Sequence, residues 1–154
     1  MTTSQAETAI PTSSKVLCAV YGVIAIAALI ATWSQNAAYF DNPGRFMIDF
    51  FNDSKVTPAS RSLTVDIVLF FLAAAILMVA EARKHGVKFV WAYIVGGLAI
   101  AISVTFPLFL IARERRLDAR EHAALAPGLS RGDRIGLVGL GGALAAFSLW
   151  TVGR

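Results

Sequence analysis

The residue best placed to do chemistry in this chain is Asp66, a carboxylate within the apolar run SLTVDIVLFFLAAAILMVA. An acid at mid-bilayer costs about 2.5–3.5 kcal/mol, so an acid kept there is a candidate proton relay or ligand contact. The pair Thr57-Pro58 predicts a helix start, which puts Asp66 about 12 Å along that helix, near the membrane interface. There, structural anchoring by a polar cluster with Arg61, Gln35 and Asn36 is the simpler interpretation.

The other chemically active side chains form no recognisable catalytic or cofactor site. The chain has no Ser/His/Asp spacing, HExxH, GxSxG or P-loop. His85 and His122 lie in basic segments between the apolar runs, so we expect them in water and no histidine pair for a haem. The single cysteine, Cys18, allows no disulfide within the chain and no CxxC chemistry. We therefore expect no enzyme, no metal and no cofactor.

The composition indicates the medium in which these residues lie. Of the 154 residues, 56% are apolar and 16% are charged, against about 25% charged in soluble domains. A membrane span needs roughly 20 apolar residues, and four runs qualify: 16–33, 63–80, 89–112 and 135–152. After a mobile polar tail over 1–15, the sequence predicts one all-α unit over 16–154, with four transmembrane helices in a compact bundle. Its location would be the cell membrane, as a multi-pass protein, and the inner membrane if the source is bacterial.

The first loop, over 34–62, is rich in phenylalanine. Asn42-Pro43 predicts a short helix, which would lie in the membrane interface. It would carry one aromatic face and one polar face. The aromatic face holds Phe46, Met47, Phe50 and Phe51, and the polar face holds Arg45, Asp49 and Asn52. This helix is either a lid over a pocket, with Phe46, Phe50 and Phe51 as its contact residues, or a plug that closes one end of the bundle.

Small residues recur at spacing four in the last two apolar runs. Gly97, Ala101 and Thr105 would share one face of the third helix, and Gly139 and Ala143 one face of the fourth. Such faces let helices approach closely in lipid, either within the bundle or against another chain. Pro107 would free the carbonyl of Ser103 and kink the third helix.

Local signals place the remaining boundaries. Gly86 turns the short loop 81–88, Ser130 and Asp133 form a capping box for the last helix, and residues 113–128 look like a polar continuation of the third helix.

With four crossings, nine Lys and Arg lie opposite the termini and five beside them, which favours termini outside. We expect the basic residues behind the net charge of +4 to contact anionic lipid headgroups, and we expect no nucleic-acid partner.

Several short motifs occur together in order. They are IDFF at 48–51, Thr64-Val65-Asp66, Glu81-Ala82-Arg83, Trp91, Pro107-Leu108-Phe109-Leu110 and Arg113-Glu114-Arg115. Over about residues 16–117 the chain resembles a bacterial family of small integral membrane proteins, the domain of unknown function numbered 2834. The resemblance implies a membrane location and a bundle built from hairpins, and it carries no assigned activity. The family usually has three helices, so the fourth looks like an addition.

Two functions fit these patterns. The first is a non-enzymatic accessory or scaffolding subunit, which would associate through its helices with a membrane-protein partner or with a second copy. The second is a small transporter, or a lipid or ion binder, that uses Asp66 and the lid of the first loop.

Overall fold

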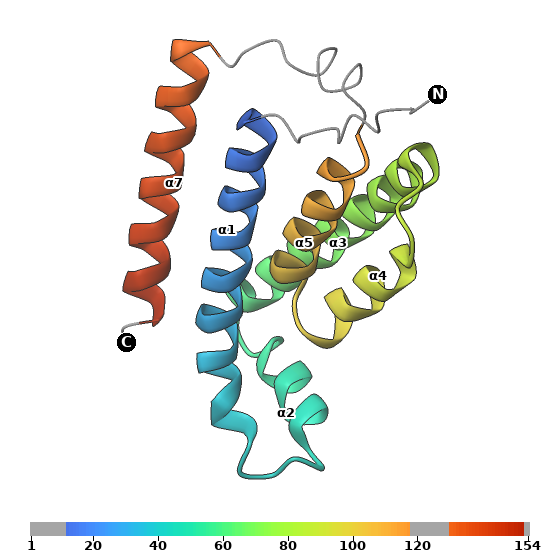
Figure 1. Ribbon diagram of the computed structural model, residues 1–154. Coiled ribbons are helices and arrows are strands. Elements are labelled where there is room, and N and C mark those ends of the chain that lie inside the picture. Colours follow the sequence, from blue (N-terminus) through green and yellow to red (C-terminus); the bar gives the residue numbers. More distant parts are fainter. Residues whose placement is uncertain (1–11, 118–129, 153–154) are drawn as a thin grey trace, which may run out of the picture.

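The computed structural model describes residues 12–117 and 130–152, and every regular element in these ranges is a helix (Figure 1). The long helices are α1, α3 and α7, and shorter helices fill the segments between them. In chain order the elements are α1 Thr12–Asn36, η1 Ala37–Tyr39, α2 Phe46–Asp53, α3 Pro58–His85, α4 Val90–Ala99, α5 Ile102–Glu114 and α7 Arg131–Val152.

The capping signals predicted at Thr57, Gly86 and Ser130 are present in the structure. The Thr57 hydroxyl accepts the Ser60 amide at 3.0 Å, and the Thr57 amide donates to the Ser60 hydroxyl at 3.0 Å. Ser130 and Asp133 make the corresponding pair at 3.1 and 2.9 Å. Gly86 ends α3 at φ 66°, a conformation that glycine adopts without strain. α1 begins at Thr12, inside the predicted tail, whose residues 1–11 lie outside the described ranges.

The single helix predicted over 89–112 is wrong. α4 ends at Ala99 and α5 begins at Ile102, and Ala101 between them is extended, with φ 179° and ψ 141°. Pro107 lies inside α5, so the chain breaks six residues before the proline rather than kinking at it. α5 also ends at Glu114, which contradicts the start of the predicted polar continuation; residues 118–129 lie outside the described ranges.

The break changes the number of possible membrane spans. Among the described residues, three stretches are long and apolar enough to cross a membrane: Ser14–Tyr39, Pro58–His85 and Arg131–Val152. α4 and α5 instead fold back on each other as a hairpin (Figure 1). The Tyr93 and Phe109 rings meet edge to face across it, with centroids 5.8 Å apart.

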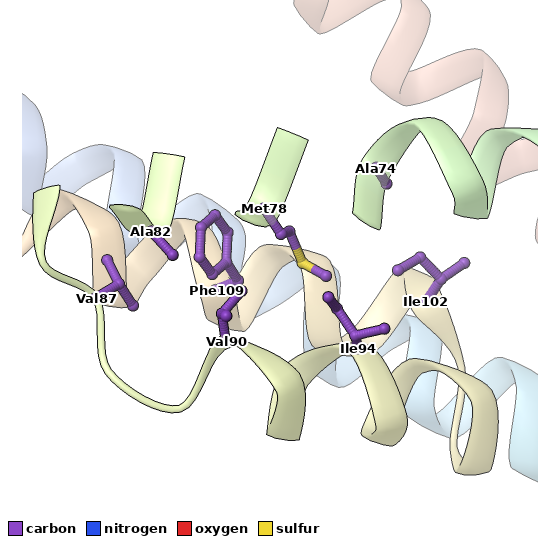
Figure 2. Close-up of a cluster of buried hydrophobic side chains, with 8 residues drawn as sticks. All are labelled: Ala74, Met78, Ala82, Val87, Val90, Ile94, Ile102 and Phe109. Atoms are coloured by element: carbon purple, nitrogen blue, oxygen red, sulfur yellow. The ribbon is translucent and has the colours of Figure 1, made fainter. Parts of the chain in front are cut away.

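The buried core lies between α3 and this hairpin. Met78 of α3 and Phe109 of α5 are both fully buried, and Figure 2 shows them among the side chains of α4. The other core members are Ala74, Ala82, Val87, Val90, Ile94 and Ile102. α1 packs along α5, while α7 lies beside α1 with its described side chains exposed (Figure 1). The hairpin is therefore fixed between α1 and α3, and its tip points toward α2.

Candidate functional site

A cavity of about 700 Å³ lies below the tip of the α4–α5 hairpin. Its size falls within the range of about 300–1,000 Å³ that is typical of small-molecule sites. Five parts of the chain form its wall: the end of α1, the aromatic face of α2, the first half of α3, the tip of the hairpin over 97–103, and the end of α7. The broken segment of the chain is thus part of the wall of the cavity.

The short helix α2 covers one side of the cavity with Phe46, Met47, Phe50 and Phe51. Stacked aromatic rings hold α2 against α1. The ring centroid of Phe46 lies 6.5 Å from that of Trp33, with an interplanar angle of 16°, and 6.2 Å from that of Phe50, with an interplanar angle of 6°. The Tyr39 hydroxyl adds a polar contact, donating to Asp53 at 2.8 Å. The helix predicted in the first loop is present, and its aromatic face lines the cavity.

The opposite side of α2 is polar, as its sequence predicts. Arg45 and Asp49 form an ion pair one helical turn apart, with Nη2 and Oδ1 separated by 3.2 Å. The bond to the Asp49 carboxylate raises the pKa of Arg45 above its ordinary value. α2 is therefore amphipathic, with its charges directed away from the cavity.

The tip of the hairpin supplies the polar backbone of the cavity. The Ile100 amide still bonds to Gly96 at 2.8 Å, and the Ala101 carbonyl accepts the Val104 and Thr105 amides at 3.1 and 3.2 Å. The first amides of a helix and the last carbonyls have no partner within it. In a membrane, backbone that leaves the helix is tolerated where it is buried in protein or lines a cavity.

The polar side chains that line the cavity are uncharged. They are Thr32, Gln35, Asn36, Ser103, Ser148 and Thr151. The hydroxyls of Thr32, Ser148 and Thr151 each donate to a carbonyl of their own helix, at 2.8, 2.8 and 2.9 Å, which leaves their oxygen atoms free to accept. Among the described residues that line the cavity, none is Asp, Glu, Lys or Arg.

An ionic cluster lies at the other end of the hairpin, and the sequence patterns did not predict it. Glu81 and His85 of α3 meet Arg113 and Glu114 of α5. One oxygen of Glu81 accepts from Nε of Arg113 and lies 3.3 Å from Nε2 of His85. Nη1 of Arg113 also donates to Glu114 at 3.4 Å. The cluster ties the end of α5 to the end of α3.

The expectation of a solvated His85 is wrong, because its side chain is only 1% exposed. Two signals could have located the cluster. Glu81 and His85 stand one helical turn apart, where side chains meet on one face. Glu81, Arg113 and Glu114 also belong to the motifs that carry the family resemblance. No group of three or more metal-ligating side chains occurs within the part of the chain that the structure describes.

A family described as "Protein of unknown function DUF2834" matches residues 20–115, which is more than half of the chain. The chain belongs to the DUF2834 family. No curated protein and no solved structure matches it. The matched range contains α2, the hairpin and all four residues of the ionic cluster, whereas α7 lies beyond it.

In this DUF2834 protein Asp66 lies apart from its predicted partners. It is exposed, and among the described residues it makes no hydrogen bond or ion pair with Arg61, Gln35 or Asn36. Arg61 donates instead to the Lys55 carbonyl at 2.9 Å. Gln35 and Asn36 line the cavity, and Asp66 does not. A functional role for Asp66 stays a prediction.

The predicted small-residue positions fall into two different environments. Gly97 and Ala101 line the cavity at the tip of the hairpin, and a Cβ atom on Gly97 would lie 2.8 Å from Phe71 and 3.0 Å from Thr105. Because the helix is broken, Gly97 and Thr105 face each other across the hairpin rather than sharing one helical face. Gly139 and Ala143 lie on exposed α7, and no heavy atom comes within 4 Å of a Cβ built on Gly139.

Proposed function

We propose that this protein is a non-enzymatic integral membrane protein that binds a neutral, lipid-like amphiphile in the cavity beneath α2. The observation that carries the proposal is an uncharged cavity of about 700 Å³, with the aromatic face of α2 on one side and the non-helical backbone of the hairpin tip on another. Ligand sites of this kind are mostly apolar, with a few polar groups that set the orientation of the ligand.

The membrane location is supported by the outward surface of the long helices. Large apolar side chains of α1, α3 and α7 are exposed along their lengths; Ile30, Leu63 and Leu149, for example, are 66%, 70% and 75% exposed. Soluble monomers rarely expose continuous apolar patches of more than a few hundred Å². Lipid covers such a surface without cost.

The chemistry of the lining favours a neutral ligand. A charged headgroup buried without a partner costs several kcal/mol or more, and the described lining residues offer it no counter-ion. Amides of Gln35 and Asn36 and the hydroxyl of Ser103 can bond to a hydroxyl, ester or carbonyl group. The phenylalanines of α2 would cover the hydrocarbon part of the ligand.

A pair of matched substitutions on α1 tests the proposal. Ala31 lines the cavity, whereas Ala27 is exposed and does not line it. We expect Ala31→Phe to abolish binding of a pyrene-labelled long-chain alcohol to the detergent-purified protein, and Ala27→Phe to leave it unchanged. The corresponding pyrene-labelled fatty acid, tested above its pKa, should bind more weakly than the alcohol. Equal binding by both variants would contradict the proposal.

The transport alternative depends on Asp66, and the same probe separates it from simple binding. Because Asp66 does not line the cavity, Asp66→Asn should leave binding of the alcohol unchanged. A loss of binding in that variant would show that Asp66 reaches the ligand and would favour the alternative.

Helix association remains a second proposal, favoured by the open face of α7. Gly136, Gly139 and Ala143 lie on one face of α7, and nothing lies within 4 Å of a Cβ on either glycine. Gly139→Leu should disrupt a dimer or a stoichiometric complex recovered in mild detergent. Gly141→Leu, on the other side of the helix and equally uncrowded, should not. A monomer in every preparation would contradict association.

A further inference from the structure

Both ends of the α4–α5 hairpin lie at the same end of the molecule. α4 starts directly after α3, and Arg113 near the end of α5 is paired with Glu81 near the end of α3. At the tip, Gly97 meets Phe71, ten residues earlier in α3 than Glu81. The 10 residues of α4 and the 13 of α5 extend about 15 and 20 Å at 1.5 Å per residue. Neither arm alone spans a hydrocarbon core of about 30 Å.

This return of the chain gathers the basic residues at one end. α1 and α7 both begin at the end where α3 and α5 finish (Figure 1). Among the described residues nine Lys and Arg lie there: Lys15, Arg83, Lys84, Lys88, Arg113, Arg115, Arg116, Arg131 and Arg134. The end that holds α2 and the cavity has three, Arg45, Lys55 and Arg61.

The acidic residues sharpen this difference. At the basic end, Glu81 and Glu114 are turned inward to the ionic cluster, with side chains 20% and 10% exposed, and Asp133 is exposed between Arg131 and Arg134. At the cavity end, Asp41, Asp53 and Asp66 are exposed, and with the half-buried Asp49 they offset the three cations. The basic end therefore presents a positive surface, and the cavity end is close to neutral.

We propose that the basic end lies in the cytoplasm and binds the anionic headgroups of the inner leaflet, so that the cavity opens toward the opposite face. Lys and Arg close to membrane helices are concentrated on the cytoplasmic side, where anionic lipids attract basic segments. This orientation reverses the one expected from four crossings, because the hairpin places Arg113, Arg115, Arg116, Arg131 and Arg134 on the same side as Lys88. It rests on the membrane location in the proposed function and is independent of the ligand.

Three single cysteines in a Cys18→Ala background test the orientation. Lys88→Cys precedes the hairpin, Arg116→Cys follows it, and Val56→Cys lies at the cavity end; all three positions are exposed. Intact spheroplasts are treated with a membrane-impermeant maleimide, and permeabilised ones serve as the control. We expect Val56→Cys to react in intact cells, and Lys88→Cys and Arg116→Cys to react only after permeabilisation.

The other labelling patterns overturn the proposal in identifiable ways. External labelling of Arg116→Cys without Lys88→Cys would mean that the segment 89–112 crosses the membrane. External labelling of Lys88→Cys and Arg116→Cys without Val56→Cys would mean the inverse orientation. Failure of the membrane location itself is separate, because the protein would then be released from membranes by alkaline carbonate.

A charge-removal experiment tests the lipid contact. One variant replaces Lys84, Lys88, Arg115 and Arg116 with Gln, and the matched control replaces Arg45, Lys55 and Arg61 with Gln. Each protein is reconstituted in mixed phosphatidylcholine and phosphatidylglycerol, extracted gently, and analysed by native mass spectrometry, with helix content checked by circular dichroism. We expect loss of bound phosphatidylglycerol only in the first variant. Equal retention, or equal loss in both, would overturn the contact.

Discussion

Replacing Arg113 with Gln should destabilise the protein more than removing the charge of an exposed arginine or lysine. Its guanidinium faces two carboxylates, Glu81 and Glu114, and links α5 to α3 across 32 positions of sequence. The side chains involved are mostly buried, with exposed fractions of 17% for Arg113, 20% for Glu81 and 10% for Glu114. Removing the cation leaves both acids without this partner in a region poorly reached by water.

The size of the effect follows from this burial. Breaking a buried ion pair by removing one partner costs about 3–5 kcal/mol. We expect about 3 kcal/mol for Arg113→Gln, at the lower limit because a fifth of the Glu81 side chain still reaches solvent. Glu81→Gln should cost less, since Arg113 keeps Glu114. The double variant should show a coupling energy of about 2 kcal/mol, within the range of about 0.5–3 kcal/mol for contacting residues.

The free energy of unfolding can be measured by titrating the protein in mild detergent with sodium dodecyl sulfate and following helix content. Arg115→Gln is the matched control, because that neighbouring side chain is exposed and should change stability by less than about 0.5 kcal/mol. If Arg113→Gln behaves like Arg115→Gln, or if the double variant shows no coupling, then the ionic cluster does not hold the hairpin in place.

The same titration tests further substitutions. Gly97→Ala places a Cβ 2.8 Å from Phe71 and should cost about 1–3 kcal/mol by overpacking. In contrast, Gly136→Ala meets nothing within 4 Å and should gain up to about 1 kcal/mol in helix propensity; equal effects at the two glycines would contradict the close approach at the tip. Thr57→Ala removes the cap of α3 and should cost about 1 kcal/mol; an unchanged midpoint would show that the cap is dispensable. Phe46→Ala should lose about 0.5–1.5 kcal/mol for each ring contact and release the pyrene-labelled alcohol faster; an unchanged release rate would exclude α2 as the lid.

The local features of this fold could be predicted because each depends on a few adjacent residues. The start of α3 at Thr57-Pro58, the turn at Gly86 and the cap at Ser130 follow from hydrogen bonds and backbone angles within one helical turn. The amphipathic helix of the first loop follows from the spacing of Phe46 and Phe50 in the same way, although it begins at Phe46 rather than at Pro43.

The broken helix could not be predicted from hydropathy. The same apolar composition fits either one long transmembrane helix or a hairpin of two short helices. The composition of the run 89–112 therefore does not show whether the chain turns back. The kink predicted at Pro107 is at the wrong position, since a proline can remain inside a helix when neighbouring groups satisfy the backbone carbonyl that it leaves without a partner. The deciding contact, Gly97 against Phe71 and Thr105, joins residues from three helices and is visible only in three dimensions.

In the candidate sites too, features set by neighbouring residues could be predicted, and contacts between distant helices could not. The aromatic face of α2 could be identified from its periodicity, but what it covers could not, because the hairpin tip that completes the wall is separated from it by about 50 positions of sequence. Glu81 and His85 were identifiable as a pair one turn apart, whereas their link to Arg113 depends on the return of α5. Asp66 illustrates the converse: an acid conspicuous in the sequence has no close partner among the described residues.

The shared end of the two hairpin arms has a consequence for biosynthesis. A helix that crosses the bilayer obliges the machinery to pass one of its flanking segments through the hydrocarbon. A loop of two half-length helices can be pushed in from the side on which it was made, and Lys88 before it and Arg113 to Arg116 after it then need never leave that compartment.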